Sequence, residues 1–235
     1  MERKNMLDVL ADTGPEFANN LSLMIGIPAI LVIVPMLVVG IPAGIVSFLV
    51  AGGTAMVTKE NMGAVFLAEA PVFIVAMLCF AVVYNAIRVG WTRVMLKLAE
   101  GQPTGFAELT ASLPWLMNFI LVCMIMGFAT LIGGFLFVVP GVYIAVRTCM
   151  APFLVVDENL GPIQAIIRSN DLVTGYAWQI ALYILLYFVG NAIAGFVPFL
   201  GFFIAIPLMG YFDFALARAY VMLKNTSAFE HNAVV

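Results

Sequence analysis

The chain has 235 residues, of which 64% are apolar and only 10% are charged, and its mean hydropathy is +1.10. So few polar residues cannot cover a water-exposed surface, which excludes an ordinary soluble domain and predicts an all-α, polytopic transmembrane helical bundle. The formal net charge is −3 and the basic residues are dispersed, which excludes a nucleic-acid-binding surface.

The first 20 residues are polar or mixed and precede the first apolar run. They are too long for the leading region of a signal peptide and contain no small-x-small cleavage site. We therefore expect the first hydrophobic segment to remain in the mature protein.

The apolar segments are measured against the roughly 20 residues that cross a hydrocarbon core of about 30 Å. Two blocks, 114–156 and 177–223, are too long for one span, and Pro140 with Gly141 is expected to break the first of them. The fourth segment is short, so five spans remain an alternative if it is re-entrant. The chain is predicted to form a single integral membrane domain over 1–235, with spans at about 21–52, 64–95, 114–139, 142–156, 177–197 and 201–223.

The first predicted span contains the tetrapeptide Gly-Ile-Pro-Ala twice. Pro28, Pro35 and Pro42 are spaced at two helical turns and remove three backbone donors, so we expect a strongly kinked or broken helix. Interrupted helices mark the binding sites of some transporters, although kinked helices without such a role are common. Gly40 and Gly44 form a small-xxx-small pair that permits close helix contact, within the chain or between protomers.

The distribution of lysine and arginine predicts the orientation of the spans. With six spans and a cytoplasmic N-terminus, Lys59 is the only basic residue in an external loop. Both termini are therefore expected to be cytoplasmic, in the inner membrane of a bacterium.

Two connections are predicted to be short amphipathic helices on the cytoplasmic face, at about 87–101 and 162–174. In the first, Trp91 would lie at headgroup depth, with Arg93 and Lys97 on a polar stripe. In the second, Arg168 would face water and anionic headgroups. Membrane lipids are thus expected partners of both helices, either as a general anchor or as one specifically recognised lipid.

Charged residues inside spans are expensive and are candidates for function. Counting 1.5 Å per residue places Glu69 and Arg147 at similar depth, and Asp213 and Arg88 deeper toward the cytoplasm. We therefore predict the buried pairs Glu69 with Arg147 and Asp213 with Arg88, with Arg218 one turn beyond Asp213. Such pairs can line a polar cavity for an ion, proton or substrate, or they can only hold helices together.

No catalytic or metal-binding pattern is visible in the sequence. Cys79, Cys123 and Cys149 lie in apolar stretches without metal-ligand spacing, and the single histidine, His231, lies in the polar tail. Ser169 has no histidine partner, and no glycine-rich phosphate loop follows a strand. The chain is therefore predicted to be no enzyme and to use neither a metal nor a cofactor.

Several ordered motifs cover about half of the chain. They are Ala-Glu-Gly-Gln-Pro at 99–103, Val-Pro-Gly-Val-Tyr-Ile-Ala-Val-Arg at 139–147, Ala-Pro-Phe-Leu-Val-Val-Asp at 151–157, Gly-Pro-Ile-Gln-Ala at 161–165 and Arg-Ser-Asn-Asp-Leu-Val-Thr-Gly at 168–175. The region 98–224 resembles a broad group of bacterial inner-membrane proteins related to the membrane domain of some glycerophosphodiester phosphodiesterases. That family usually has an aromatic residue where Asn170 stands, and it favours tryptophan near Trp178.

The resemblance implies a multi-span bundle with a short amphipathic helix between spans four and five. It implies no defined activity, but association with the phosphodiesterase suggests a lipid-handling or envelope-related role. The leading prediction is a non-enzymatic protein that handles a small solute, ion or lipid through a polar bundle interior. The alternative is a membrane scaffold or assembly subunit that forms a homo-oligomer or binds a membrane-protein partner.

Overall fold

The structure is a computed structural model that describes residues 6–53, 62–111, 113–196 and 200–233. All elements in these ranges are helical, which confirms the all-α prediction. The α-helices are α1 (Met6–Asn19), α2 (Leu21–Pro35), α3 (Ile41–Gly53), α4 (Met62–Ala99), α5 (Glu108–Ala111), α6 (Leu116–Leu136), α7 (Val138–Thr148), α8 (Ala151–Asp157), α9 (Pro162–Val173), α10 (Ala177–Gly195) and α11 (Leu200–Ala233). A π-helical segment, η1 (Met36–Gly40), and a 3₁₀ segment, η2 (Leu113–Trp115), complete the order.

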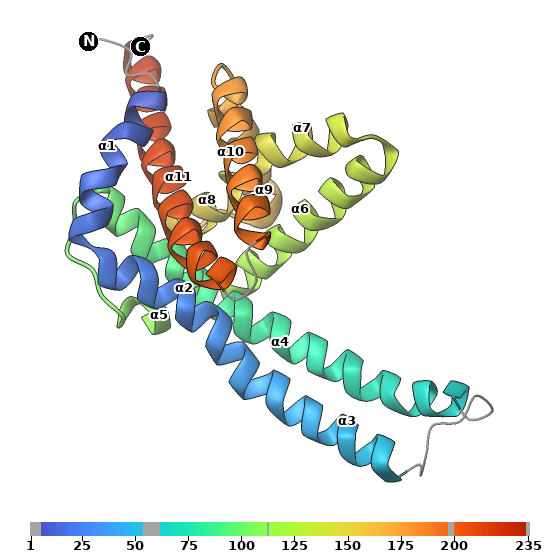
Figure 1. Ribbon diagram of the computed structural model, residues 1–235. Coiled ribbons are helices and arrows are strands. Elements are labelled where there is room, and N and C mark those ends of the chain that lie inside the picture. The colour runs from blue at the N-terminus through green and yellow to red at the C-terminus, as the bar shows by residue number, and fades with distance from the viewer. Residues whose placement is uncertain (1–5, 54–61, 112, 197–199, 234–235) are drawn as a thin grey trace.

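Six helical segments within the described residues are long and apolar enough to cross a membrane, as a multi-pass membrane protein requires. They form three helical hairpins: α2, η1 and α3 with α4, then α6 with α7, and finally α10 with α11 (Figure 1). The hairpin of α3 and α4 projects furthest from the rest of the molecule (Figure 1).

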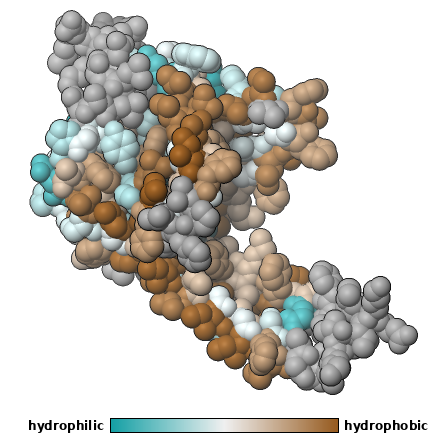
Figure 2. All heavy atoms as spheres, viewed as in Figure 1, coloured by the Kyte–Doolittle hydropathy of each residue, from teal (hydrophilic) through white to brown (hydrophobic). Residues whose placement is uncertain are grey.

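The hairpins meet at a helical body, where the hydrophobic core is concentrated. The largest fully buried side chains include Trp91 of α4, Leu154 of α8 and Tyr220 of α11. Toward the hairpin tips the side chains are apolar but exposed, as at Phe135 and Phe196. Hydrophobic residues cover the hairpins, whereas hydrophilic residues gather on the body beside α1 (Figure 2). We use the name body for α1, residues 89–99 of α4, α5, α8, α9 and α11 from Asp213 onward.

The first span is interrupted more mildly than expected from its prolines. Pro28 and Pro35 lie inside α2, and the helix continues through η1, where the N–H of Ile41 bonds the carbonyl of Met36. Because Pro42 has no N–H, a wider π turn before it reorganises the hydrogen bonds without a break. The interruption is therefore one π-helical turn between two proline-containing helices.

The break between the third and fourth spans does not lie at Pro140 and Gly141 as predicted. The extended residue is Phe137, with φ −162° and ψ 147°, and Pro140 lies in the first turn of α7, where a helix needs no backbone donor. Gly141 instead permits close contact between α6 and α7. A Cβ atom at Gly141 would lie 2.7 Å from the backbone nitrogen of Gly134.

Two further differences concern the surface helices. The segment 87–101 is no separate interfacial helix but mainly the end of α4, and it is largely buried in the body. Residues 6–19 form α1, which packs along α11 (Figure 1), with Phe17 against Tyr211 at 5.5 Å between ring centroids. The predicted helix at 162–174 corresponds to α9.

Candidate functional site

Arg88 of α4 and Asp213 of α11 form a two-pronged ion pair where the first and third hairpins meet the body. The Nη1 and Nη2 atoms of Arg88 donate to the two carboxylate oxygens of Asp213 at 2.6 and 3.1 Å. The planar guanidinium matches the carboxylate fork, so one pair fixes the register of two helices. The predicted pairing of Arg88 with Asp213 is therefore present.

Trp91 completes this centre, in contrast to its predicted place at the lipid interface. Its indole Nε1 donates to Asp213 at 2.7 Å, and its side chain is 1% exposed. Arg88 and Trp91 are three residues apart and share one face of α4. The three-residue spacing is therefore a sequence signal for this contact, whereas residue type alone predicts a tryptophan at the membrane surface.

A cavity of about 130 Å³ opens beside the ion pair. Arg88, Trp91 and Asp213 form its polar side, while its apolar walls include Phe119 of α6 and Phe153 of α8. The space is large enough for several water molecules. The cavity therefore brings a charged pair into contact with an enclosed space that a small polar group can occupy.

The ion pair is accessible rather than sealed. The side chains of Arg88 and Asp213 retain 28% and 18% of their exposure. A guanidinium has five N–H donors, and Asp213 accepts two of them, so three have no protein acceptor among the described residues. The centre as a whole is neutral, but its unused hydrogen-bonding capacity consists mainly of donors, which suit a ligand with acceptor oxygens.

Tyrosines surround the centre on the hairpin side. Tyr84 lies one turn before Arg88 on α4 and stacks on Phe80, with 6.3 Å between ring centroids. On α10, Tyr183 donates its hydroxyl to the carbonyl of Phe212, next to Asp213, and Tyr187 packs on the Phe212 ring at 5.1 Å. Aromatic rings with polar tips thus line the transition from the charged centre to the apolar hairpins.

The other predicted pair, Glu69 with Arg147, does not form. Arg147 donates from Nη1 to the Thr174 hydroxyl at 2.8 Å and to the Asn170 carbonyl at 3.4 Å, so it joins α7 to the end of α9. Glu69 lies in the outer part of the projecting hairpin, and its buried Oε1 atom has no hydrogen-bond partner among the described residues. Glu69 and Arg147 have similar predicted depths but are not neighbours. The reason is that α7 packs against α9 and not against α4.

Arg218 is not part of the central pair. Its Nη1 atom lies 3.2 Å from a carboxylate oxygen of Glu16, and its guanidinium stands over the Phe214 ring. The contact joins α11 to α1, a helix that is not predicted from the sequence. Arg218 therefore has a structural role at the body surface.

Two predicted lipid-contact residues, Arg93 and Lys97, instead bind one carboxylate of the body. Lys97 Nζ lies 2.6 Å and Arg93 Nε 3.0 Å from Glu108, and Arg93 also covers the Trp115 ring at 4.7 Å. The hydrogen bond from Lys97 and the positive charges of both residues lower the pKa of Glu108 below its ordinary value. Arg168 remains exposed on α9 and is available to headgroups.

A second cluster that the sequence did not indicate closes the base of the body. One carboxylate oxygen of Asp157 accepts from the Tyr220 hydroxyl at 2.6 Å and from Lys224 Nζ at 2.5 Å. These contacts fix the end of α8 against α11. One oxygen of this carboxylate accepts from two side chains of α11, so the cluster holds α8 and α11 together.

Within the part of the chain that the structure describes, no three potential ligand side chains are grouped to hold a metal ion. No family model, curated protein or solved structure matches the chain. The resemblance drawn from its motifs therefore stays a prediction, and function must be argued from the geometry of the centre.

Proposed function

We propose that this multi-pass membrane protein is a non-enzymatic binding protein that receives a small polar solute or headgroup in the cavity beside Arg88 and Asp213. The observation that carries the proposal is an accessible ion pair on the wall of a cavity of about 130 Å³. The pair also holds α4 against α11, and its exposure on a cavity wall leaves it able to contact a ligand as well.

The chemistry of the cavity favours a ligand with acceptor oxygens. Three N–H donors of Arg88 have no protein acceptor among the described residues, while Asp213 already accepts from both Arg88 and Trp91. A phosphate or carboxylate group would satisfy the remaining donors with charge-assisted hydrogen bonds. The apolar walls would exclude competing water and strengthen these bonds.

The proposal places the protein in the inner membrane of a bacterium with both termini cytoplasmic. Support comes from the distribution of lysine and arginine in the sequence. In this orientation the body lies on the cytoplasmic side, and its cavity is reached from the cytoplasmic leaflet or from the cytoplasm.

Trp91 provides a direct test because its ring forms part of the cavity wall. The variant Trp115→Phe/Trp178→Phe leaves Trp91 as the only tryptophan of the three in the chain. In detergent micelles freed of phospholipid, titration with glycerol phosphate is expected to give a saturable change in Trp91 emission. Arg88→Gln should weaken this response by about tenfold or more, since charge-assisted hydrogen bonds are lost.

Two further variants make the result specific. Arg88→Lys keeps the charge but loses the planar fork, so it should bind more weakly while the fold is kept. Arg168→Gln removes an exposed arginine of α9 and should leave the titration unchanged. A parent protein without a saturable response, or an Arg88→Gln variant with undiminished affinity, would refute binding at this centre.

The scaffold alternative is favoured by a different observation, the projecting hairpin of α3 and α4 (Figure 1). In the Glu69–Ala99 segment, none of the most apolar eighteen-residue window is buried within the chain. A protein partner on this hairpin would cover it. Native mass spectrometry from nanodiscs distinguishes the two functions, because a scaffold should emerge as a defined oligomer or complex and a binding protein as a chain with a retained ligand.

A further inference from the structure

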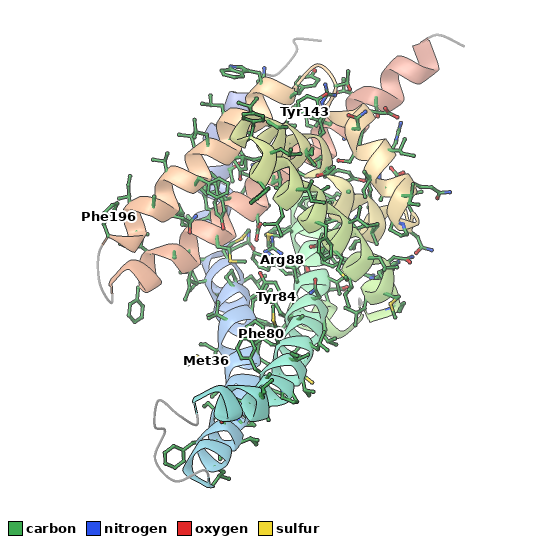
Figure 3. The ribbon with its side chains drawn as sticks, turned by 90° about the vertical axis from the view of Figure 1, so that its right-hand side faces the viewer. Met36, Phe80, Tyr84, Arg88, Tyr143 and Phe196 are labelled. Atoms are coloured by element: carbon green, nitrogen blue, oxygen red, sulfur yellow. The ribbon has the colours of Figure 1, made fainter. Side chains whose placement is uncertain are left out.

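The apolar groove of the first hairpin leads to the charged centre along a single face of α4. Phe73, Ala76, Phe80, Tyr84 and Arg88 recur at three- or four-residue spacing and therefore lie on one side of the helix. Figure 3 shows Phe80, Tyr84 and Arg88 following one another along α4. A molecule on this face would meet apolar side chains first, then a tyrosine, then the guanidinium.

The outer part of this face is hollowed into a groove of about 380 Å³ between α4 and the helix formed by η1 and α3. Small residues make the hollow: Gly40, Ala43 and Gly44 form one wall and Ala76 part of the other, with Phe80 among its lining residues. Phe80 stacks on Tyr84 at 6.3 Å, which connects the groove to the residue one turn before Arg88.

The spacing of charged residues on α4 indicates how deep Arg88 and the groove lie in the bilayer. Glu69 and Arg88 are 19 residues apart with no charged residue between them. That distance is about 28 Å along a helix, close to the ~30 Å hydrocarbon core of a bilayer. Arg88 therefore lies near the edge of the hydrocarbon on the body's side, at the level of the phosphate groups of that leaflet.

From Arg88, the groove begins at Phe80, about 12 Å along the helix. One leaflet contributes about 15 Å of hydrocarbon. A lipid whose phosphate lies at Arg88 would therefore extend an acyl chain past Tyr84 into the groove. The charge at one end and the apolar hollow at the other are complementary to such a molecule.

We infer that the ligand is a phospholipid of the leaflet on the body's side, with its phosphate at Arg88 and one acyl chain in the groove between α3 and α4. The inference rests on the proposed function, because the phosphate occupies the cavity beside Arg88 and Asp213. The groove adds the chain, which glycerol phosphate lacks.

The test is native mass spectrometry of the full chain released from nanodiscs of phosphatidylcholine and phosphatidylglycerol. The wild type should retain one phospholipid. Ala76→Phe fills the groove and should lower the retained fraction by about tenfold, because the chain loses its packing. Ala81→Phe is the matched control, since Ala81 lies on an exposed face of the same helix.

A second variant guards against misfolding of the first. Gly44→Phe blocks the groove from the opposite wall, and a Cβ atom at Gly44 meets nothing within 4 Å. Both groove variants should keep the Trp91 response to glycerol phosphate, which also confirms that the centre is intact.

The outcomes separate the two proposals. If both groove variants retain phospholipid as the wild type does, or the wild type retains none, the inference about the chain is overturned. The proposed function then stands or falls on the glycerol phosphate titration alone. If glycerol phosphate gives no response at Trp91 of the protein freed of phospholipid, the headgroup site itself is absent and both proposals are wrong.

Discussion

Asp213 accepts hydrogen bonds from two side chains of α4, so its carboxylate joins two spans far apart in sequence. Removing one member of a fully buried ion pair costs about 3–5 kcal/mol. Because Arg88 and Asp213 are partly exposed, we expect Asp213→Asn to lower the free energy of unfolding by about 2 kcal/mol. Equilibrium unfolding in bicelles measures this change.

The control is Asp171→Asn, which removes an exposed carboxylate from α9 and should change stability by less than about 0.5 kcal/mol. The double variant Arg88→Gln/Asp213→Asn should be less destabilised than the two single changes added together. Additive effects would show that Arg88 and Asp213 do not stabilise one another.

Glu108 is predicted to give the body a dependence on acid pH. Its pKa is lowered in the fold, chiefly by the hydrogen bond from Lys97, so its stabilising contribution is complete above its ordinary value of 4.5. The contribution is lost as the pH falls through the lower, folded-state pKa. The melting temperature of the wild type should therefore exceed that of Glu108→Gln at neutral pH, and the difference should begin to narrow below pH 4.5 and vanish below the lower folded-state pKa.

Glu158→Gln is a suitable comparison for that experiment, because Glu158 is exposed at the end of α8. It should show no such narrowing. A difference between wild type and Glu108→Gln that widens toward acid pH would contradict the assigned contact.

At the scale of elements, the crossing of α6 and α7 depends on Gly141 more than on Gly134. A Cβ atom at Gly141 would lie 2.7 Å from the Gly134 nitrogen, whereas a Cβ atom at Gly134 meets nothing within 4 Å. Gly141→Ala should therefore destabilise the protein by about 2 kcal/mol, and Gly134→Ala should be tolerated. Unfolding measurements on the two variants decide the matter, and equal effects would refute the close approach.

Length and hydropathy were sufficient to predict six membrane-spanning segments, because the hydrocarbon thickness limits each span in the same way. They did not predict α1, because Gly14 and Pro15 are poor helix formers and the helix depends on packing against α11. They also misplaced the break at Phe137, because proline is tolerated in the first turn of a helix.

For the candidate site, depth counting found Arg88 with Asp213 but failed for Glu69 with Arg147. Depth ranks residues along the membrane normal and contains no information about which helices are neighbours. The tilt of α7 toward α9 arises from tertiary contacts, among them Arg147 with Thr174. Such contacts between distant segments cannot be read from one sequence.

At the scale of the whole molecule, α1 lies beside the C-terminal part of α11, so the first and the last described helices belong to the same body (Figure 1). With six spans, reporters fused to the N- and C-termini should give the same cytoplasmic signal. A reporter inserted after Lys59, in the connection between α3 and α4, should give the opposite one. Terminal reporters on opposite sides would exclude an even number of spans.

The ion pair of the centre joins residues 125 positions apart in the chain. At about 5–20 residues per second, synthesis of that intervening length takes roughly 6–25 s. During this interval α4 has already emerged, yet the carboxylate that neutralises Arg88 does not exist, so the guanidinium lacks its protein partner. Nascent chains that stop before α11 would therefore carry an uncompensated charge, which gives quality-control proteases a chemical mark for incomplete products.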